Sequence, residues 1–160
     1  MRHSLAVLPS KSDGTAFLLG RAYLNYHTVL QSLLEAEGLD EHFRPGQGSI
    51  LFSLFEGDGA SMSELAARTS LAASSVTQVI SQMERSGLVK RTRDASDGRA
   101  VRVRLTPLAR RLEPRCRALN ERVHELLQAG LSARQASELR RLLAVVVTNL
   151  HGYFTDRSGQ

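Results

Sequence analysis

The chain has 160 residues, 42% of them hydrophobic, and a formal net charge of +5, which suits one domain with a packed core and a polyanionic partner. No apolar run approaches the eighteen or more residues of a membrane span, and the N-terminus lacks the apolar stretch of a secretory signal, so we expect no membrane partner. The single cysteine, Cys116, excludes an intramolecular disulfide framework and favours a reducing compartment, so we expect a cytoplasmic protein.

The first part of the chain predicts a flexible arm at 1–14 and then two helices. Apolar residues recur at helical spacing from Thr15 to Glu37, and Gly38 is placed to end that helix. A short apolar helix follows Pro45 and ends near Gly57. The apolar stripe of the first helix is long for a helix at the start of a small domain.

The middle of the chain predicts a helix-turn-helix. Ser61 and Glu64 form a capping box at the start of one helix, and after a break near 69–71 a second helix runs to about Ser86, with Gly87 as its stop. One face of this second helix is apolar. The other face carries hydroxyls and amides, which suit base edges and phosphates: Ser74, Ser75, Thr77, Gln78, Ser81 and Gln82.

A basic hairpin follows directly. Residues 88–93 and 101–106 alternate as half-buried strands, and the turn formers between them include Gly98. Residues 85–122 hold twelve Lys or Arg and four acids, so the positive charge is concentrated here. A clustered basic region on a mildly acidic body is typical of a protein that binds nucleic acid.

Two further helices complete the chain. Thr106 and Pro107 begin a helix that extends to about Ala129, and a capping box of Ser132 and Gln135 opens a last helix to about Phe154. Both carry apolar stripes that one small domain cannot cover, which indicates a partner chain.

This order of elements resembles the MarR family of bacterial transcription regulators. The similarity runs from about Thr15 to Phe154 and is carried most specifically by MSELAARTSL, SSVTQVISQMERSGLVKR, Asp97-Gly98-Arg99 and VRLTP. The resemblance implies a mainly α fold with a small β-hairpin wing. It places a winged helix-turn-helix DNA-binding core at 44–106 and dimerisation helices at 15–38 and 107–154, within one MarR-like domain at 15–160.

The resemblance also implies a function. The protein would be a repressor that binds a pseudo-palindromic operator in double-stranded DNA as a homodimer, with recognition helices in successive major grooves roughly 34 Å apart. Ser74 to Gln82 would face the major groove through the six polar residues named above. Arg91 and Arg93 would lie along the wing stem, and Arg99 would enter the minor groove from a tip braced by Asp97 and an arginine partner.

Two positions depart from the family pattern. Ala72 stands where the family usually has a serine that opens the recognition helix, so the helix cap must come from elsewhere. Gln78 stands where many members have arginine, and because glutamine pairs with adenine whereas arginine prefers guanine, we expect a different operator.

In family members the first two helices help to line an effector crevice. The resemblance therefore implies a small aromatic or phenolic effector, and the residues of these helices that suit it are Tyr23, Tyr26, His27, Phe52 and Phe55. No tight ligand spacing is shown by His27, His42, His124 and His151, and no P-loop, nucleophile elbow, HExxH motif or cysteine pair is present. We therefore expect no metal, no cofactor and no enzymatic activity.

Two alternatives stay open. The protein would be a redox-sensing regulator if Arg115 and Arg117 lowered the pKa of the Cys116 thiol enough to make it reactive. It would be a winged-helix protein-interaction module if the exposed face of its second short helix were apolar or acidic, but that face is neither.

Overall fold

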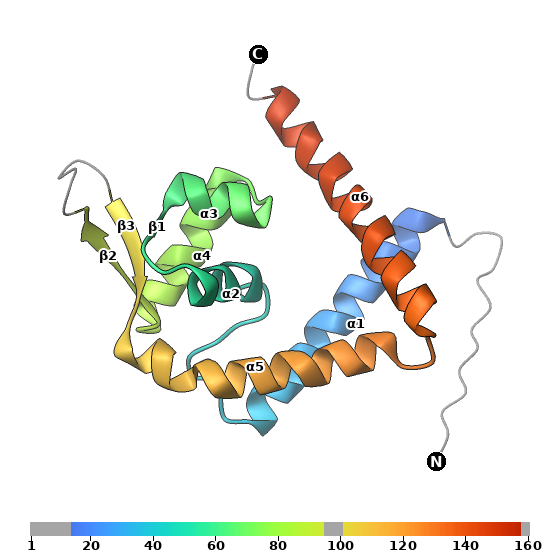
Figure 1. The fold of residues 1–160 in the computed structure, drawn as a ribbon, viewed down its shortest axis with the longest axis horizontal. Helices are drawn as coiled ribbons and strands as arrows, with labels where there is room; N and C mark the ends of the chain where they lie inside the picture. Colours follow the sequence, from blue (N-terminus) through green and yellow to red (C-terminus); the bar gives the residue numbers. More distant parts are fainter. Residues whose placement is uncertain (1–13, 95–100, 158–160) are drawn as a thin grey trace.

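The computed structural model describes residues 14–94 and 101–157, with side chains as far as Tyr153 (Figure 1). Within these residues the chain forms six α-helices and one three-stranded sheet. Most of the predicted N-terminal arm and the tip of the predicted hairpin, with Asp97 and Arg99, lie outside the described residues.

Three long helices form one side of the molecule. Helix α1 (Thr15–Ala36) ends before Gly38, whose φ of 60° is the left-handed conformation that glycine favours. Helix α5 (Pro107–Gln128) begins at the Thr106 cap, and α6 (Ala133–Arg157) follows the predicted Ser132–Gln135 capping box. In Figure 1, α5 runs from the sheet toward the start of α6, and α6 and α1 overlap in this view.

The winged part is built from the shorter elements. These are α2 (Gly48–Glu56), β1 (Ala60–Ser61), α3 (Met62–Thr69), α4 (Ala73–Arg85), β2 (Val89–Arg93) and β3 (Val101–Leu105). The antiparallel sheet has the order β1-β3-β2, so β3 is its central strand. Val103 of β3 lies opposite Ala60 of β1 on one side and opposite Arg91 of β2 on the other. The sequence predicts the β2–β3 hairpin but misses β1, because a strand of two residues shows no alternation.

Local chemistry sets the helix-turn-helix. The Glu64 amide donates to the Ser61 hydroxyl at 3.2 Å, and the Ser61 amide donates to the Glu64 carboxylate at 2.6 Å, so the predicted capping box is present. Ser70 closes α3 in the left-handed region with φ 54°, and Gly87 ends α4 with φ 74°. These two breaks fix where α4 begins and ends.

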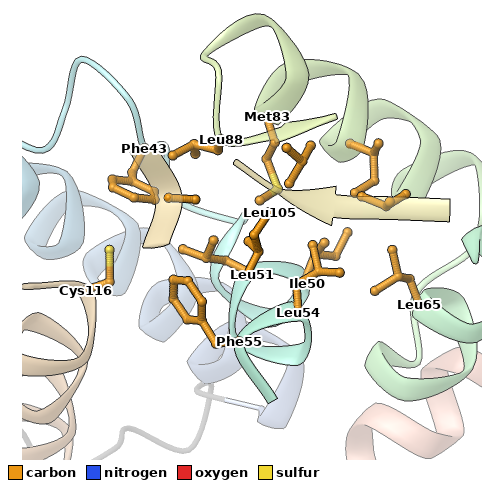
Figure 2. Close-up of a cluster of buried hydrophobic side chains, with 14 of the residues drawn as sticks. Phe43, Ile50, Leu51, Leu54, Phe55, Leu65, Met83, Leu88, Leu105 and Cys116 are labelled. Atoms are coloured by element: carbon orange, nitrogen blue, oxygen red, sulfur yellow. The ribbon is translucent and has the colours of Figure 1, made fainter. Parts of the chain in front are cut away.

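One apolar core holds α4 against the sheet. Ile50, Leu54, Leu65, Ile80 and Met83 have no exposed surface. Figure 2 shows side chains from α2, α3, α4 and β3 meeting in this cluster, with Phe43 and Cys116 at its edge. Since such cores are close-packed, the position of α4 relative to the wing stem is mechanically defined.

The long helices leave many large apolar side chains uncovered by the chain itself. Those between about a third and two thirds accessible include Phe17, Leu18, Tyr23, Leu24, Val29, Leu126, Leu127, Leu139, Leu142, Leu143, Val145, Val147, Leu150 and Tyr153. They are spread over α1, the end of α5 and α6. An exposed apolar surface of this extent marks an interaction face.

The predicted fold class is confirmed: the chain is mainly α-helical with a small β wing. The limits assigned to the arm, the core and the dimerisation helices remain predictions. Along the described residues, no helix is both long enough and apolar enough to span a membrane.

Candidate nucleic-acid interface and effector crevice

Helix α4 buries one face and presents the other. Val76, Ile80 and Met83 have no exposed surface, whereas Ser74, Ser75, Thr77 and Gln78 are exposed and Ser81 and Gln82 are half-buried. The predicted polar residues therefore share one side of the helix. Those of its first two turns are the most accessible.

The hydroxyl of Thr77 is already used within the helix. It donates to the Ala73 carbonyl at 2.9 Å, so the oxygen presents its acceptor lone pair outward together with the side-chain methyl group. The exposed amide of Gln78 has both a donor and an acceptor group. Neighbouring positions thus offer different chemistry.

The start of α4 has no side-chain cap. Ala72 is its N-cap residue, with an extended backbone and no side chain able to accept. The expectation that another residue supplies the cap is wrong for the described part of the chain, where no side chain accepts from the first amides of α4. These amides lie at the positive end of the helix dipole, where an anion is favoured.

Arg91 connects α4 to the wing stem. Its guanidinium donates to the Glu84 carboxylate at 2.6 Å and to the Ser81 hydroxyl at 3.0 Å, and its backbone amide donates to Glu84 at 3.2 Å. Arg91 and Ser81, which were both predicted to contact DNA, are thus hydrogen-bonded to each other. Arg93, one pleat further along β2, is exposed.

Arg102 braces the hairpin. Its Nε donates to Asp94 at 2.6 Å and its Nη1 to Glu64 at 2.8 Å, so the end of β2 is tied to the start of α3. Hydrogen bonds from Ser61 and the charge of Arg102 hold the pKa of Glu64 below its ordinary value, and Asp94 raises the pKa of Arg102. The sequence predicts a bracing pair of this kind at Asp97, which lies outside the described residues, and misses the one at Asp94.

A cavity of about 510 Å³ lies between α1, α2 and α5. Of the five residues expected at an effector crevice, Tyr26 and Phe52 line this cavity, together with residues not among the five, such as Arg44, Cys116 and Arg117. The other predicted residues lie outside the lining: Phe55 packs edge-on against Phe52 in the core, and the rings of Tyr23 and His27 lie 6.1 Å apart on the surface of α1. On α1, only the side of the helix toward α2 and α5 faces the cavity, and spacing alone does not identify that side.

The crevice combines aromatic surface with charged groups of both signs, Arg44 and Arg117 beside Glu56 and Glu121. The Arg117 guanidinium carbon lies 5.5 Å from the Phe55 ring centre and 6.0 Å from that of Phe52. Burial raises the pKa of the Tyr26 hydroxyl, so this group stays protonated as a donor. Such a lining suits an aromatic group that bears an anion.

Cys116 has the opposite character from the one that the redox-sensing alternative requires. The side chain is buried, and burial raises the pKa of its thiol to about 11 despite the opposing charge of Arg115. Arg115 does act to lower this pKa, as the redox-sensing alternative supposes, but desolvation of the buried thiol outweighs it. Within the described ranges no group of three or more His, Cys, Asp or Glu is placed to hold a metal ion.

Comparisons with known proteins fit this geometry. The MarR family profile matches residues 43–101, from the end of the loop before α2 to the start of β3. Over 140 residues the chain is 27% identical to the HTH-type transcriptional repressor IacR of Pseudomonas putida, covering 88% of this chain and 81% of IacR. MarR is thus the family whose profile matches the winged part of the chain.

Solved structures extend the likeness across the MarR fold. A probable transcriptional regulator from Pseudomonas aeruginosa is 26% identical, with a TM-score of 0.73 over 84% of this chain and 97% of that one. Bordetella bronchiseptica BpsR, whose DNA binding is regulated by 6-hydroxynicotinic acid, is 23% identical, with a TM-score of 0.73 over 86% of this chain and 96% of BpsR. The relatives that match are named as transcriptional regulators and not as enzymes.

Proposed function

We propose that this protein is a MarR family repressor that binds a two-fold symmetric operator in double-stranded DNA as a homodimer. The observation that carries the proposal is the exposed face of α4, which is polar, free of acid in its first two turns and flanked by a basic hairpin. A helix with this face, held on a rigid core, has the shape and chemistry to enter a major groove. The relative IacR is named a transcriptional repressor, which favours repression.

In the proposed complex α4 divides into two halves. Ser74, Ser75, Thr77 and Gln78 reach base edges and phosphates, and the uncapped amides before them point toward the phosphate backbone. Ser81 is held by Arg91, so it contributes at the margin of the contact together with Gln82. Base reading is thus concentrated in the N-terminal half of the helix.

The wing adds charge. Arg93 and Arg104 are exposed on the two strands of the hairpin and suit phosphate contacts. The proposal retains Arg99 as a minor-groove residue on the strength of the family resemblance. Arg91 acts on DNA chiefly by fixing the angle between β2 and α4.

The exposed apolar side chains of α1 and α6 support the homodimer. A second copy would cover them by two-fold symmetry, and in the proposed complex the two copies of α4 lie one helical turn of DNA apart. The operator would then be pseudo-palindromic.

The crevice supports an effector, a small aromatic or phenolic carboxylic acid. Phe52 and Tyr26 offer apolar and donor surface, and Arg117 offers a cation, while BpsR is regulated by an aromatic acid of this kind. Such a ligand relieves repression only if it binds better to the conformation that is unsuited to DNA.

A DNA titration tests the proposal. Fluorescence anisotropy of a labelled duplex from the region upstream of the coding sequence, against a scrambled duplex and across a salt series, should show tighter binding to the former. Ser75→Glu, which places a negative charge on the reading face, should weaken binding by on the order of tenfold or more. Its matched control is Ser137→Glu, which adds the same charge on α6; equal loss in both variants would contradict the assignment of α4.

A calorimetric titration tests the effector. Small aromatic acids, with 6-hydroxynicotinic acid as the first probe, should bind one per chain, and Arg117→Gln should weaken that binding. A panel of benzoic and hydroxybenzoic acids that gives no heat of binding would contradict the effector part and leave the DNA part standing.

Neither alternative function is favoured. The α4 face is neither apolar nor acidic, as a protein-contact module requires, and the Cys116 thiol is buried with a raised pKa, which opposes redox sensing.

A further inference from the structure

A row of charged side chains leads out of the crevice along α5. Arg117, which lines the cavity, donates from Nε and Nη2 to the same carboxylate oxygen of Glu113, at 2.9 and 2.7 Å. The second oxygen of Glu113 lies 4.0 Å from Nη1 of Arg110. Positions 110, 113 and 117 share one face of the helix because they are spaced i, i+3 and i+7.

The row ends on Asp58, in the turn between α2 and β1. Nη2 of Arg110 donates to Oδ2 of Asp58 at 2.9 Å. The other oxygen, Oδ1, accepts from the backbone amide of Leu105 at 2.8 Å and from that of Gly59 at 2.9 Å. The carboxylate therefore joins α5, the start of β1 and the end of β3.

Asp58 replaces a missing strand residue. The register that pairs Ala60 with Val103 would place residue 58 opposite Leu105, but β1 has only two residues. The side chain of Asp58 accepts the hydrogen bond that a longer β1 would have accepted through its backbone. The base of the wing hairpin thus depends on a carboxylate that is itself held by Arg110.

We propose that Glu113, Arg110 and Asp58 are positioning residues that transmit the state of Arg117 in the crevice to the base of the wing. The inference rests on the proposed function, because both the effector bound beside Arg117 and the DNA bound by the wing belong to that proposal. An anionic effector that takes the hydrogen bonds of Arg117 releases Glu113 toward Arg110. Arg110 then divides its charge between Glu113 and Asp58, and the Asp58 bond to the Leu105 amide weakens.

Amide hydrogen exchange on the full chain, without ligand or DNA, tests the route directly. Arg117→Gln should speed exchange at Leu105 by about 1.4- to 5-fold, the range expected from losing one exposed ion pair. Glu113→Gln, which removes the carboxylate that competes with Asp58 for Arg110, should not speed it. Exchange at the buried Ile80 amide in α4 is the internal reference and should not change. Arg141→Gln, which breaks a comparable i, i+3 pair with Glu138 on α6, is the matched control and should leave Leu105 unchanged.

A double variant distinguishes an effect that passes from Arg117 to Leu105 through Asp58 from a general loss of stability. Asp58→Asn should speed exchange at Leu105 by itself, and adding Arg117→Gln should then have no further effect, since the path between them is already cut. Additive effects, equal changes at Leu105 and Ile80, or no change in Arg117→Gln would each overturn the inference. Because this measurement needs no DNA, its failure is distinguishable from failure of the proposed operator binding, which the anisotropy titration reports.

Discussion

Gln78 and Thr77 are adjacent on the exposed face of α4 but differ in what they present to a base pair. The Gln78 amide can donate and accept at once, which matches the N6 and N7 edge of adenine. Thr77 presents an acceptor and a methyl group, because its hydroxyl hydrogen is given to Ala73. Specificity at this scale is therefore assigned chiefly to Gln78.

Gln78→Ala should lose discrimination at one base pair in each half-site. We expect a cost of about 1–3 kcal/mol against the preferred base and little change for the other bases. Competition binding with duplexes that each differ at one base pair measures this. Gln128→Ala, at the end of α5, is the matched control, and an unchanged base preference in the Gln78 variant would remove this residue from base reading.

The Cys116 thiol should be unreactive in the folded protein. Its pKa of about 11, against an ordinary 9.0, leaves about a hundredfold less thiolate near pH 8. Alkylation by iodoacetamide, followed by mass spectrometry, should be slow in the native state and fast after unfolding in guanidinium chloride. Rapid native alkylation, together with loss of DNA binding after peroxide treatment, would restore the redox-sensing alternative.

Residue patterns predict the site where it lies along one helix and miss it where it is assembled across the fold. The polar face of α4 follows from helical periodicity in a stretch of nine residues. Local patterns do not reveal the role of Asp58, because its partners Leu105 and Arg110 are 47 and 52 positions away in the sequence. The burial of Cys116 depends likewise on packing that no local spacing reveals.

At the scale of elements, α3 and the wing are joined through one carboxylate. Glu64 caps its own helix through Ser61 and also receives Nη1 of Arg102 from β3. The same side chain thus stabilises the first helix of the helix-turn-helix and the position of the hairpin beside it.

This double role predicts a pH dependence. The pKa of Glu64 is lowered in the folded protein, first by the Ser61 amide, so its stabilising effect is present above its ordinary pKa of 4.5 and disappears as the pH falls through the lowered value. Glu64→Gln should therefore be less stable than the unaltered protein near pH 7, and the difference should shrink in acid. Urea unfolding at a series of pH values measures it, with Glu125→Gln on α5 as the control for removing an exposed carboxylate. A difference that grew in acid would contradict the assigned sign.

The helices could be predicted from the sequence because their capping residues and terminating glycines lie within a few positions of the helix ends. The predicted ends of α1, α4 and α5 agree with the structure to within a residue or two. Strand β1 was not predictable, since it exists through pairing with β3 rather than through its own two residues.

At the scale of the whole molecule, the uncovered side chains of α1 and α6 predict an obligate partner. The chain has a mass of 17.6 kDa, and sedimentation equilibrium at micromolar concentration should give about twice that value. Leu150→Glu, which places a charge at a position 54% exposed in the single chain, should shift the protein toward the monomer and weaken operator binding. Ser137→Glu on the same helix should remain dimeric. A monomeric parent protein, or a Leu150→Glu variant as dimeric as the parent, would contradict the proposed interface.

Selection from a random duplex library tests the central claim, that two copies of α4 read DNA by symmetry. The account predicts enrichment of one pseudo-palindromic sequence whose half-site centres lie roughly 10–10.5 base pairs, or a multiple of that, apart. Preference within each half-site should move when Gln78 is replaced. Enrichment of no sequence, with weak binding that depends only on salt, would mean that the basic surface holds DNA without reading it and would contradict the account.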